Sequence, residues 1–271
     1  MINPKARAWK EINLDYLAHN AHFLQGRLVP GCDLMAVVKA NAYGHGAVPV
    51  SKRLEREGVD AFAVACLEEG IVLRQAGVEG MILVLGFTPP EEAPLLVRWR
   101  LTQTVVDEAH GRTLSDAGVP LQVHLALDTG MHRLGIPTEE TESLSRLYRM
   151  KNLKISGIFS HLCVSDSLTQ EDRYYIRNQL ERFYCAVDWL RGNGYNPGKI
   201  HIQASGGILN LPPQLCSYAR AGIALYGAAG SMEDSLRPVL SLRARVACVR
   251  TLATGEGAGY NLAFRAERET R

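Results

Sequence analysis

The hydrophobic positions of this chain follow two alternating patterns. Short apolar runs, typical of strands buried on both faces, are each followed by a segment whose apolar residues recur at helical spacing. The apolar runs predict strands over residues 35–39, 61–65, 81–85, 101–106, 121–127, 155–160, 199–203 and 217–221. The helical spacing predicts helices over residues 14–27, 47–57, 67–75, 91–99, 108–117, 139–149 and 170–191.

This succession of about eight strand–helix units, with no second pattern between them, predicts a closed (β/α)8 TIM barrel. A doubly wound open sheet is the alternative, but it would normally contain fewer strands and a glycine-rich first turn. The first turn here, residues 40–44, reads ANAYG, which is not a GxGxxG loop. We therefore expect an α/β barrel over residues 1–235.

The pattern changes near residue 240. Residues 240–252 alternate between apolar and polar positions with a period of two, which predicts an antiparallel strand with one face in water. One or two strands cannot make a stable domain. Either the strand expected over residues 7–12 completes this edge, or a β-domain has been cut short. We favour the second, so residues 236–271 are expected to begin an incomplete C-terminal β-domain, with which strand 7–12 could pair.

Composition excludes several classes of function. The net charge is +2 and no basic stripe carries interleaved aromatic residues, so we expect no nucleic-acid partner. No apolar run reaches the roughly 20 residues of a membrane span, and the N-terminus lacks a secretion signal. The six cysteines form no CxxC pair, so we expect no metal site and reduced thiols in the cytoplasm. A preceding domain that tethers the protein to the membrane remains an alternative.

The most informative chemistry lies in residues 34–46, which read LMAVVKANAYGHG. An apolar strand ends here at Lys39, and a lysine at the end of a buried strand can be partly desolvated. Desolvation lowers the pKa of the amine and frees the lone pair that forms an imine with a carbonyl cofactor. Taken alone, Lys39 would more often be an ordinary solvated lysine, because lysines are rarely buried.

Three further strings follow predicted strands, at the edge where barrels place their chemistry. Residues 128–135 read DTGMHRLG, and the guanidinium of Arg133 can hold a carboxylate with two hydrogen bonds. His161 ends the sixth strand of the barrel. Small residues and glycines at residues 203–207 and 220–227 allow backbone N–H groups to approach an anion such as a phosphate.

Together these strings resemble the bacterial alanine racemases, which depend on pyridoxal 5'-phosphate (PLP). The resemblance runs from about residue 8 to at least residue 252. It implies that Lys39 carries PLP as an imine and serves as one catalytic base. It implies that Arg133 lies near the substrate carboxylate and that His161 packs against the pyridine ring. A phosphate cup is expected from the Ser205 hydroxyl and the backbone N–H groups of Gly222 and Ile223, closed by Tyr43.

Arg220 matches the family pattern RxGIAxYG and is expected to face the pyridine nitrogen of PLP. An arginine is permanently charged and can only donate hydrogen bonds, so this nitrogen would stay unprotonated. A carbanion on the substrate would then be poorly delocalised into the ring. This arrangement suits a proton that leaves Cα and returns quickly on the other face, and it disfavours transamination.

The chain departs from the family pattern at three places. Many members have a lysine, often carbamylated, where this chain has Ala126, so the usual partner of the arginine is absent. Residues 203–206 read QASG where the family often reads ANSA. Both changes are closer to the racemase domain of vancomycin-resistance serine racemases. The family's second base, a tyrosine in an IGYADG stretch of the partner subunit's β-domain, has no counterpart here, so we expect little racemase activity from this chain alone.

The leading hypothesis is an amino-acid racemase that interconverts the L and D forms of alanine or serine and supplies D-amino acid for peptidoglycan precursors. The full-length enzyme is expected to be a homodimer. The alternative is a single-barrel PLP-binding protein that stores or delivers the cofactor; such proteins fit the length but lack the AxVKANAYGHG and DTGMxRLG strings. A PLP lyase or aldolase of related fold would usually need a metal site, which we do not find.

Overall fold

The computed structural model describes residues 6–228 and 235–271 and divides into two compact units. Among the described residues, the larger unit comprises 12–228 and 235–239, and the smaller comprises 6–11 and 240–271. None of the helices in the described ranges is long and apolar enough to cross a membrane. All six cysteines are free thiols.

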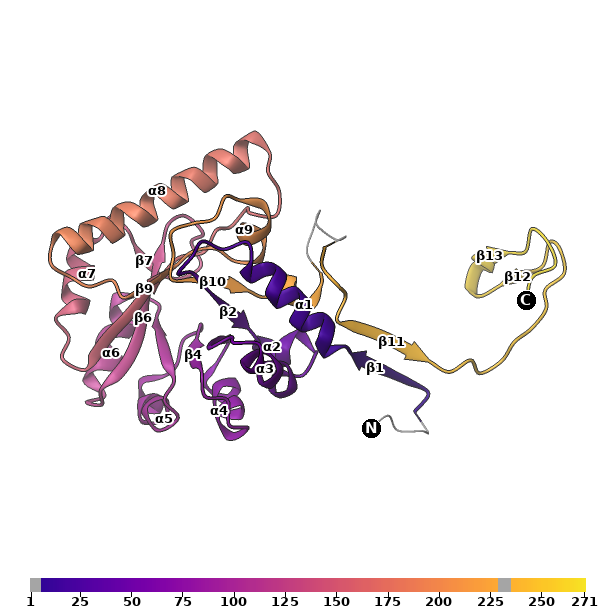
Figure 1. Ribbon diagram of the computed structural model, residues 1–271, viewed down its shortest axis with the longest axis horizontal. Coiled ribbons are helices and arrows are strands. Elements are labelled where there is room, and N and C mark those ends of the chain that lie inside the picture. The colour runs from indigo at the N-terminus through magenta and orange to yellow at the C-terminus, as the bar shows by residue number, and fades with distance from the viewer. Residues whose placement is uncertain (1–5, 229–234) are drawn as a thin grey trace. The chain divides into compact units, whose positions relative to one another are not determined.

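The larger unit is built around a sheet of parallel strands (Figure 1). Eight of them lie in the order β10 (Tyr218–Ala221), β2 (Asp33–Val37), β3 (Ala61–Val64), β4 (Met81–Val84), β5 (Thr102–Val105), β6 (Leu121–Asp128), β8 (Leu153–Phe159) and β9 (Lys199–His201). The two-residue strand β7 (Ile136–Pro137) pairs with β6 outside this path.

The two ends of this strand order, β9 and β10, meet through a few backbone contacts. The N–H of Ser217 donates to the carbonyl of Ile200 at 2.8 Å, and the N–H of Arg220 donates to the carbonyl of Gln203 at 3.0 Å. Ala204 and Arg220 form an isolated parallel bridge. The strands therefore form a nearly closed ring, so the predicted barrel is confirmed and the open doubly wound sheet is wrong.

Helices follow the strands, as the sequence predicted, and lie outside the sheet (Figure 1). They are α1 (Leu14–Gln25), α3 (Ala47–Arg56), α4 (Leu67–Gln75), α5 (Ala93–Arg98), α6 (Glu108–Asp116), α7 (Thr141–Tyr148) and α8 (Gln170–Gly192), with a 3-10 turn η1 (Pro90–Glu92) before α5. Local sequence sets where several of them begin. The Asn13 side chain accepts two backbone N–H bonds at the start of α1, and Thr169 with Asp172 forms a capping box before α8.

The core has two layers, which follow from the alternation of side chains along each strand. One cluster joins buried strand residues to buried helix residues and lies between the sheet and the helices. The other contains strand residues alone and fills the barrel interior: Met35, Val37, Ala61, Ala63, Leu83, Ala126, Phe159 and Tyr218. Val37, Ala126 and Phe159 of this inner cluster also line the cavity described below.

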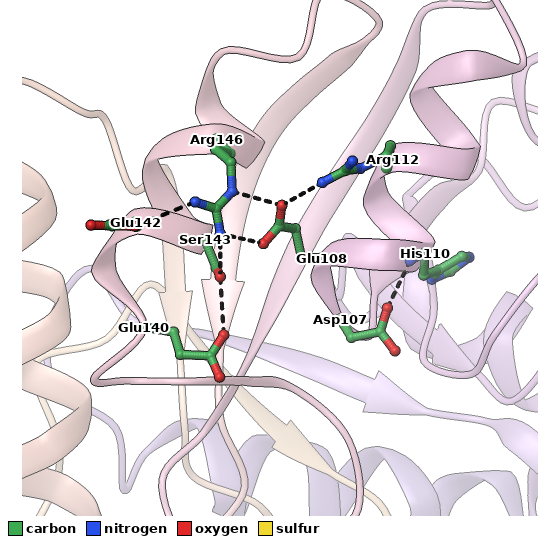
Figure 2. Close-up of polar contacts among 8 residues, drawn as sticks. All are labelled: Asp107, Glu108, His110, Arg112, Glu140, Glu142, Ser143 and Arg146. Atoms are coloured by element: carbon green, nitrogen blue, oxygen red, sulfur yellow. Dashed lines mark hydrogen bonds and ion pairs between the residues drawn. The ribbon is translucent and has the colours of Figure 1, made fainter.

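Glu108 anchors an ion-pair network between α6 and α7 (Figure 2). Its carboxylate accepts from Nε and one terminal nitrogen of Arg146, both at 2.7 Å, and from Arg112 at 2.9 Å. Asp107 caps α6 by accepting from the backbone N–H of His110. The hydrogen bonds from Arg146 and Ser143 lower the pKa of Glu108 to about 2.

The smaller unit contains two short sheets. Strand β1 (Ala8–Ile12) pairs with β11 (Leu240–Ala244), and Glu11 forms an ion pair of 3.1 Å with Arg243. Strand β12 (Gly257–Ala258) pairs antiparallel with β13 (Phe264–Arg265), and the 3-10 turn η4 (Tyr260–Leu262) lies between them. The alternating pattern predicted one strand to residue 252, but β11 ends at Ala244, and the N–H of Arg245 makes one more backbone bond, to the carbonyl of Arg7 at 2.8 Å.

Candidate functional site

A cavity of about 530 Å³ opens at the carboxyl ends of the barrel strands. The chain turns there out of the ring of strands, so side chains from many loops converge on one space. All eight candidate residues from the sequence line this cavity: Lys39, Tyr43, Arg133, His161, Ser205, Arg220, Gly222 and Ile223. The structure thus brings together residues that are up to 184 positions apart, from residue 39 to residue 223.

Lys39 begins a tight turn whose backbone is left-handed. Strand β2 ends at Val37, two residues earlier than predicted, and the short element α2 (Lys39–Tyr43) follows. Ala40, Asn41, Ala42 and Tyr43 all have φ between 51° and 54°, in the left-handed region. Such a conformation costs roughly 1–2 kcal/mol for each residue other than glycine. Surrounding contacts must therefore hold this turn in place.

Glu69 of α4 supplies one of these contacts. Its carboxylate accepts the backbone N–H of Ala40 at 2.7 Å and that of Ala65 at 2.8 Å. The Asn41 side chain accepts the N–H of Ala47 at 2.8 Å, which ties the turn to the start of α3. The two residues after Lys39 are therefore each fixed to a neighbouring element of the barrel, Ala40 to α4 and Asn41 to α3.

Tyr226, in the 3-10 turn η2 (Ile223–Tyr226), also helps to hold the left-handed turn in place. Its hydroxyl donates to the carbonyl of Val37 at 3.0 Å, and its ring stacks on His45 at 4.4 Å. The Nδ1 atom of His45 lies 2.9 Å from the carbonyl oxygen of Ala42, within the left-handed turn. Burial raises the pKa of Tyr226, so its hydroxyl keeps its proton. Neither Tyr226 nor Glu69 was a sequence candidate, because each acts through its position in the fold.

Ser205 organises the part of the cavity expected to bind phosphate. It begins the short helix α9 (Ser205–Asn210), which the sequence analysis missed because its glycines hide the helical pattern. Its hydroxyl oxygen accepts the backbone N–H of Gly222 at 3.0 Å and that of Ala224 at 3.2 Å. The Gly222 N–H, expected to face the phosphate directly, is thus bonded to Ser205. Two accepted bonds leave the Ser205 hydroxyl proton free to donate to an anion.

Gly222 also allows Tyr43 to approach. A Cβ atom built on Gly222 would lie 2.7 Å from the Tyr43 hydroxyl, which is closer than real Cβ contacts come. Burial raises the pKa of Tyr43, so this hydroxyl is a neutral donor. The two hydroxyl groups, from Tyr43 and Ser205, therefore line the same part of the cavity wall.

Arg133 is an exposed cation in the loop between β6 and β7. None of the carboxylates in residues 6–228 and 235–271 forms an ion pair with it. The nearby Asp128 is already occupied, since His132 lies 2.9 Å from it and the backbone N–H of Gly130 donates to it. Ala126 is buried and small, so it leaves space in the cavity lining. Arg133 is available to bind an anionic ligand.

Arg220 is 3% exposed and holds a dense set of contacts. Its terminal nitrogens donate to the carbonyl of Ser160 at 2.6 Å and to Nδ1 of His201 at 2.7 Å, and they lie 3.1 Å from Nδ1 of His161. Its guanidinium group lies 5.1 Å from the centre of the Phe159 ring. Burial lowers the pKa of Arg220 to about 10, which still leaves it charged at neutral pH.

His161 is kept neutral by this environment. Burial, and then the charges of Arg220, Arg133 and Lys39, lower the pKa of His161 to about 3. The cavity therefore combines a lysine, two arginines and a neutral imidazole with two hydroxyl donors. This set can bind a ligand that carries phosphate and carboxylate groups, and its lysine can react with a carbonyl carbon.

Comparisons with known proteins point to one family. The family described as "Alanine racemase, N-terminal domain" matches residues 12–230. The chain is 40% identical over 270 residues to an amino-acid racemase of Enterococcus faecalis, covering 97% of this chain and 38% of that protein. It is 40% identical over 273 residues to a serine/alanine racemase of Enterococcus gallinarum, covering 98% of this chain and 39% of that protein.

Solved structures show the same fold. An alanine racemase of Clostridium difficile 630 superposes with a TM-score of 0.85 at 31% identity, covering 98% of this chain and 72% of that chain. The present chain thus spans about two fifths of the length of the two Enterococcus relatives and nearly three quarters of this crystallised one.

Proposed function

The chain belongs to the alanine racemase family, and on that premise we propose that it is the PLP-binding barrel of a racemase acting on a small amino acid. One observation carries the proposal: Lys39, Arg133 and Arg220 line a single cavity beside the hydroxyl groups of Tyr43 and Ser205. The substrate is alanine or serine in both its L and D forms, and the D form would serve peptidoglycan synthesis in the cytoplasm.

The residues of the cavity fit PLP. Ser205, with its hydroxyl oriented by two backbone N–H groups, and Tyr43 would hold the phosphate together with Ile223 and Gly222. Lys39 would bind the cofactor's carbonyl carbon, and Arg220 would face its ring nitrogen. When bound, PLP withdraws electrons from the substrate's Cα and makes the proton there acidic.

Each residue then has one task. Arg133 binds the substrate carboxylate, for which a free guanidinium is suited. The Lys39 amine takes up or returns the proton on one face of Cα. Arg220 keeps a fixed positive charge and can only donate, which limits charge build-up on the ring and favours rapid return of the proton. His161 stays neutral and adds an aromatic surface without another charge.

Racemisation also needs a base on the second face of Cα. The described residues that line the cavity include no lysine besides Lys39 and no tyrosine besides Tyr43, which is assigned to the phosphate. As the family resemblance implies, we place the second base on a partner subunit of a homodimer, and we expect the 271-residue chain alone to racemise weakly. A storage protein for PLP would not need a free Arg133, so that alternative is less favoured.

The test is the absorbance spectrum of the purified chain mixed with PLP, before and after Lys39→Ala. A visible band of lysine-bound cofactor that is lost in K39A supports the proposal. Lys52→Ala is the matched control, because Lys52 lies in α3 and contacts Glu55 and not the cavity. A spectrum that is the same for wild type and K39A would overturn the proposal.

A further inference from the structure

Two buried histidines lie behind Arg220, and the reaction proposed above does not use them. His124 in β6 and His201 in β9 are both 0% exposed. Nδ1 of His124 lies 2.9 Å from Nε2 of His201, and Nδ1 of His201 lies 2.7 Å from a terminal nitrogen of Arg220. The three side chains form a line of hydrogen bonds inside the barrel.

The direction of this line follows from the chemistry of its ends. A guanidinium group carries N–H donors and no acceptor, so Nδ1 of His201 must accept from Arg220. A neutral imidazole has one donor and one acceptor, so Nε2 of His201 carries the proton and donates to Nδ1 of His124. Nε2 of His124 must then carry the last proton.

Burial keeps both rings in this neutral form. Burial, followed by the charge of Arg220, lowers the pKa of His124 to about 3 and lowers that of His201 well below its ordinary value. Phe159 stacks on His201 with ring centres 4.9 Å apart and planes 7° from parallel. His201 is therefore held in one orientation as well as in one protonation state.

Gly157 of β8 packs against the His124 ring, at the end of the hydrogen-bonded line farthest from Arg220. Nε2 of His124 is buried and has no hydrogen-bond partner among the described residues. A Cβ atom built on Gly157 would lie 2.6 Å from both Nε2 and Cε1 of His124. The fold thus tolerates one buried N–H group without a partner, which is unfavourable, at His124.

We propose that His201 and His124 are positioning residues that aim Arg220 at the cavity. The hydrogen bonds from Arg220 to described residues all leave from its two terminal nitrogens, so its Nε–H has no partner among them, and Arg220 also lines the cavity. His201 can hold a terminal nitrogen only while its own proton stays on Nε2, and the acceptor on His124 keeps it there. The consequence for the cofactor's ring nitrogen rests on the proposed function, whereas the line itself does not.

The first experiment reads the protons directly in the full chain without cofactor. Histidines labelled with ¹⁵N give distinct NMR correlations for the two neutral tautomers and for the charged ring. We expect both His124 and His201 as neutral Nε2–H tautomers between pH 6 and pH 8, assigned with His124→Asn and His201→Asn. An Nδ1–H tautomer or a charged ring at pH 6 at either position would overturn the proposal, whatever the outcome of the Lys39 experiment.

The second experiment separates a positioning role from a merely structural one. His124→Leu removes the acceptor, whereas His124→Asn keeps an oxygen where Nδ1 now lies. We expect His124→Leu to weaken PLP binding roughly fivefold and to shift the visible band of the bound cofactor, since the hydrogen bond that is lost is worth about 1 kcal/mol. His124→Asn is expected to restore both values to within about twofold of the wild type.

His110→Leu is the matched control, because His110 is also a buried histidine but packs in α6 against Thr88. It should lower stability without moving the PLP band. Equal band positions in His124→Leu and the wild type would count against the proposal. If the wild-type chain binds no PLP, the proposed function fails, and the NMR measurement alone decides the line of hydrogen bonds.

Discussion

The hydroxyl of Tyr226 donates a hydrogen bond of 3.0 Å to the carbonyl oxygen of Val37, at the end of the strand that leads to Lys39. These two residues are 189 positions apart in the chain. The bond joins the last turn of the barrel to its first strand, beside the proposed cofactor lysine. Because the contact is buried, its loss cannot be fully repaired by water.

Tyr226→Phe should therefore lower the free energy of unfolding by about 1 kcal/mol and weaken PLP binding. For a unit of this size, that loss corresponds to a melting temperature lower by about 2–4 °C, measured by circular dichroism. Tyr148→Phe is the control, since the Tyr148 hydroxyl also donates to a carbonyl at 3.0 Å but away from the cavity. The idea fails if both variants bind PLP as the wild type does.

In the left-handed turn after Lys39, replacing alanine by glycine is expected to stabilise the protein. Ala40 is exposed and has φ of 51°, so Ala40→Gly should raise the free energy of unfolding by about 1 kcal/mol. Ala109→Gly, in the first turn of the right-handed helix α6, should lower it by up to about 1 kcal/mol. Urea unfolding measures both values, and a loss of stability in Ala40→Gly would contradict the assigned backbone hand.

Arg133 should govern the binding of amino acids and not the binding of PLP. Because no described carboxylate pairs with it, Arg133→Gln removes a ligand contact without leaving a protein charge unpaired. We expect PLP affinity to change less than twofold, while the titration of PLP-loaded protein with L-alanine or L-serine weakens roughly tenfold or more. Arg112→Gln, at the network of Figure 2, is the control for a change of net charge. Unchanged titrations in Arg133→Gln would remove this residue from the substrate site.

The ion-pair network of Glu108 predicts a stability that depends on pH. Its folded-state pKa of about 2 lies below the ordinary value, so its contribution is complete above the ordinary pKa and is lost as pH falls toward about 2. Glu108→Gln should lower stability by about 1 kcal/mol or less at pH 7, because the pair lies at the surface. Unfolding at pH 7 and near pH 2.5 checks this, and a difference that persists unchanged at the lower pH would exclude the ion pair as its source.

The barrel and the gathering of eight candidate residues could be predicted because both depend on local strings. Short apolar runs indicate strands that are buried on both faces, and motifs such as DTGMHRLG indicate the loops after those strands. In a barrel, all such loops lie at one end, so strand order alone brings Lys39 and Arg220 to the same cavity.

What the sequence did not predict depends on contacts between distant segments. The backbone hand at Ala40 to Tyr43 is held by contacts with Glu69 and Tyr226, and of these four residues only Asn41 has a local propensity for it. The sequence could have indicated that His124 and His201 are buried in the barrel. Each histidine lies on the face of its strand that points into the barrel, as the spacing of His124 and Ala126 on β6 shows. A buried histidine on that face needs a hydrogen-bond partner.

The reversed turn between Lys39 and Gly44 also limits which side chains evolution can place there. A β-branched residue at positions 40–42 would press its second γ atom against its own carbonyl, so valine, isoleucine and threonine are disfavoured there, and glycine and asparagine are favoured. A library randomised at positions 40–42 should lose β-branched residues even when selected for folding alone. Their depletion at these three positions would then record the geometry of the peptide chain.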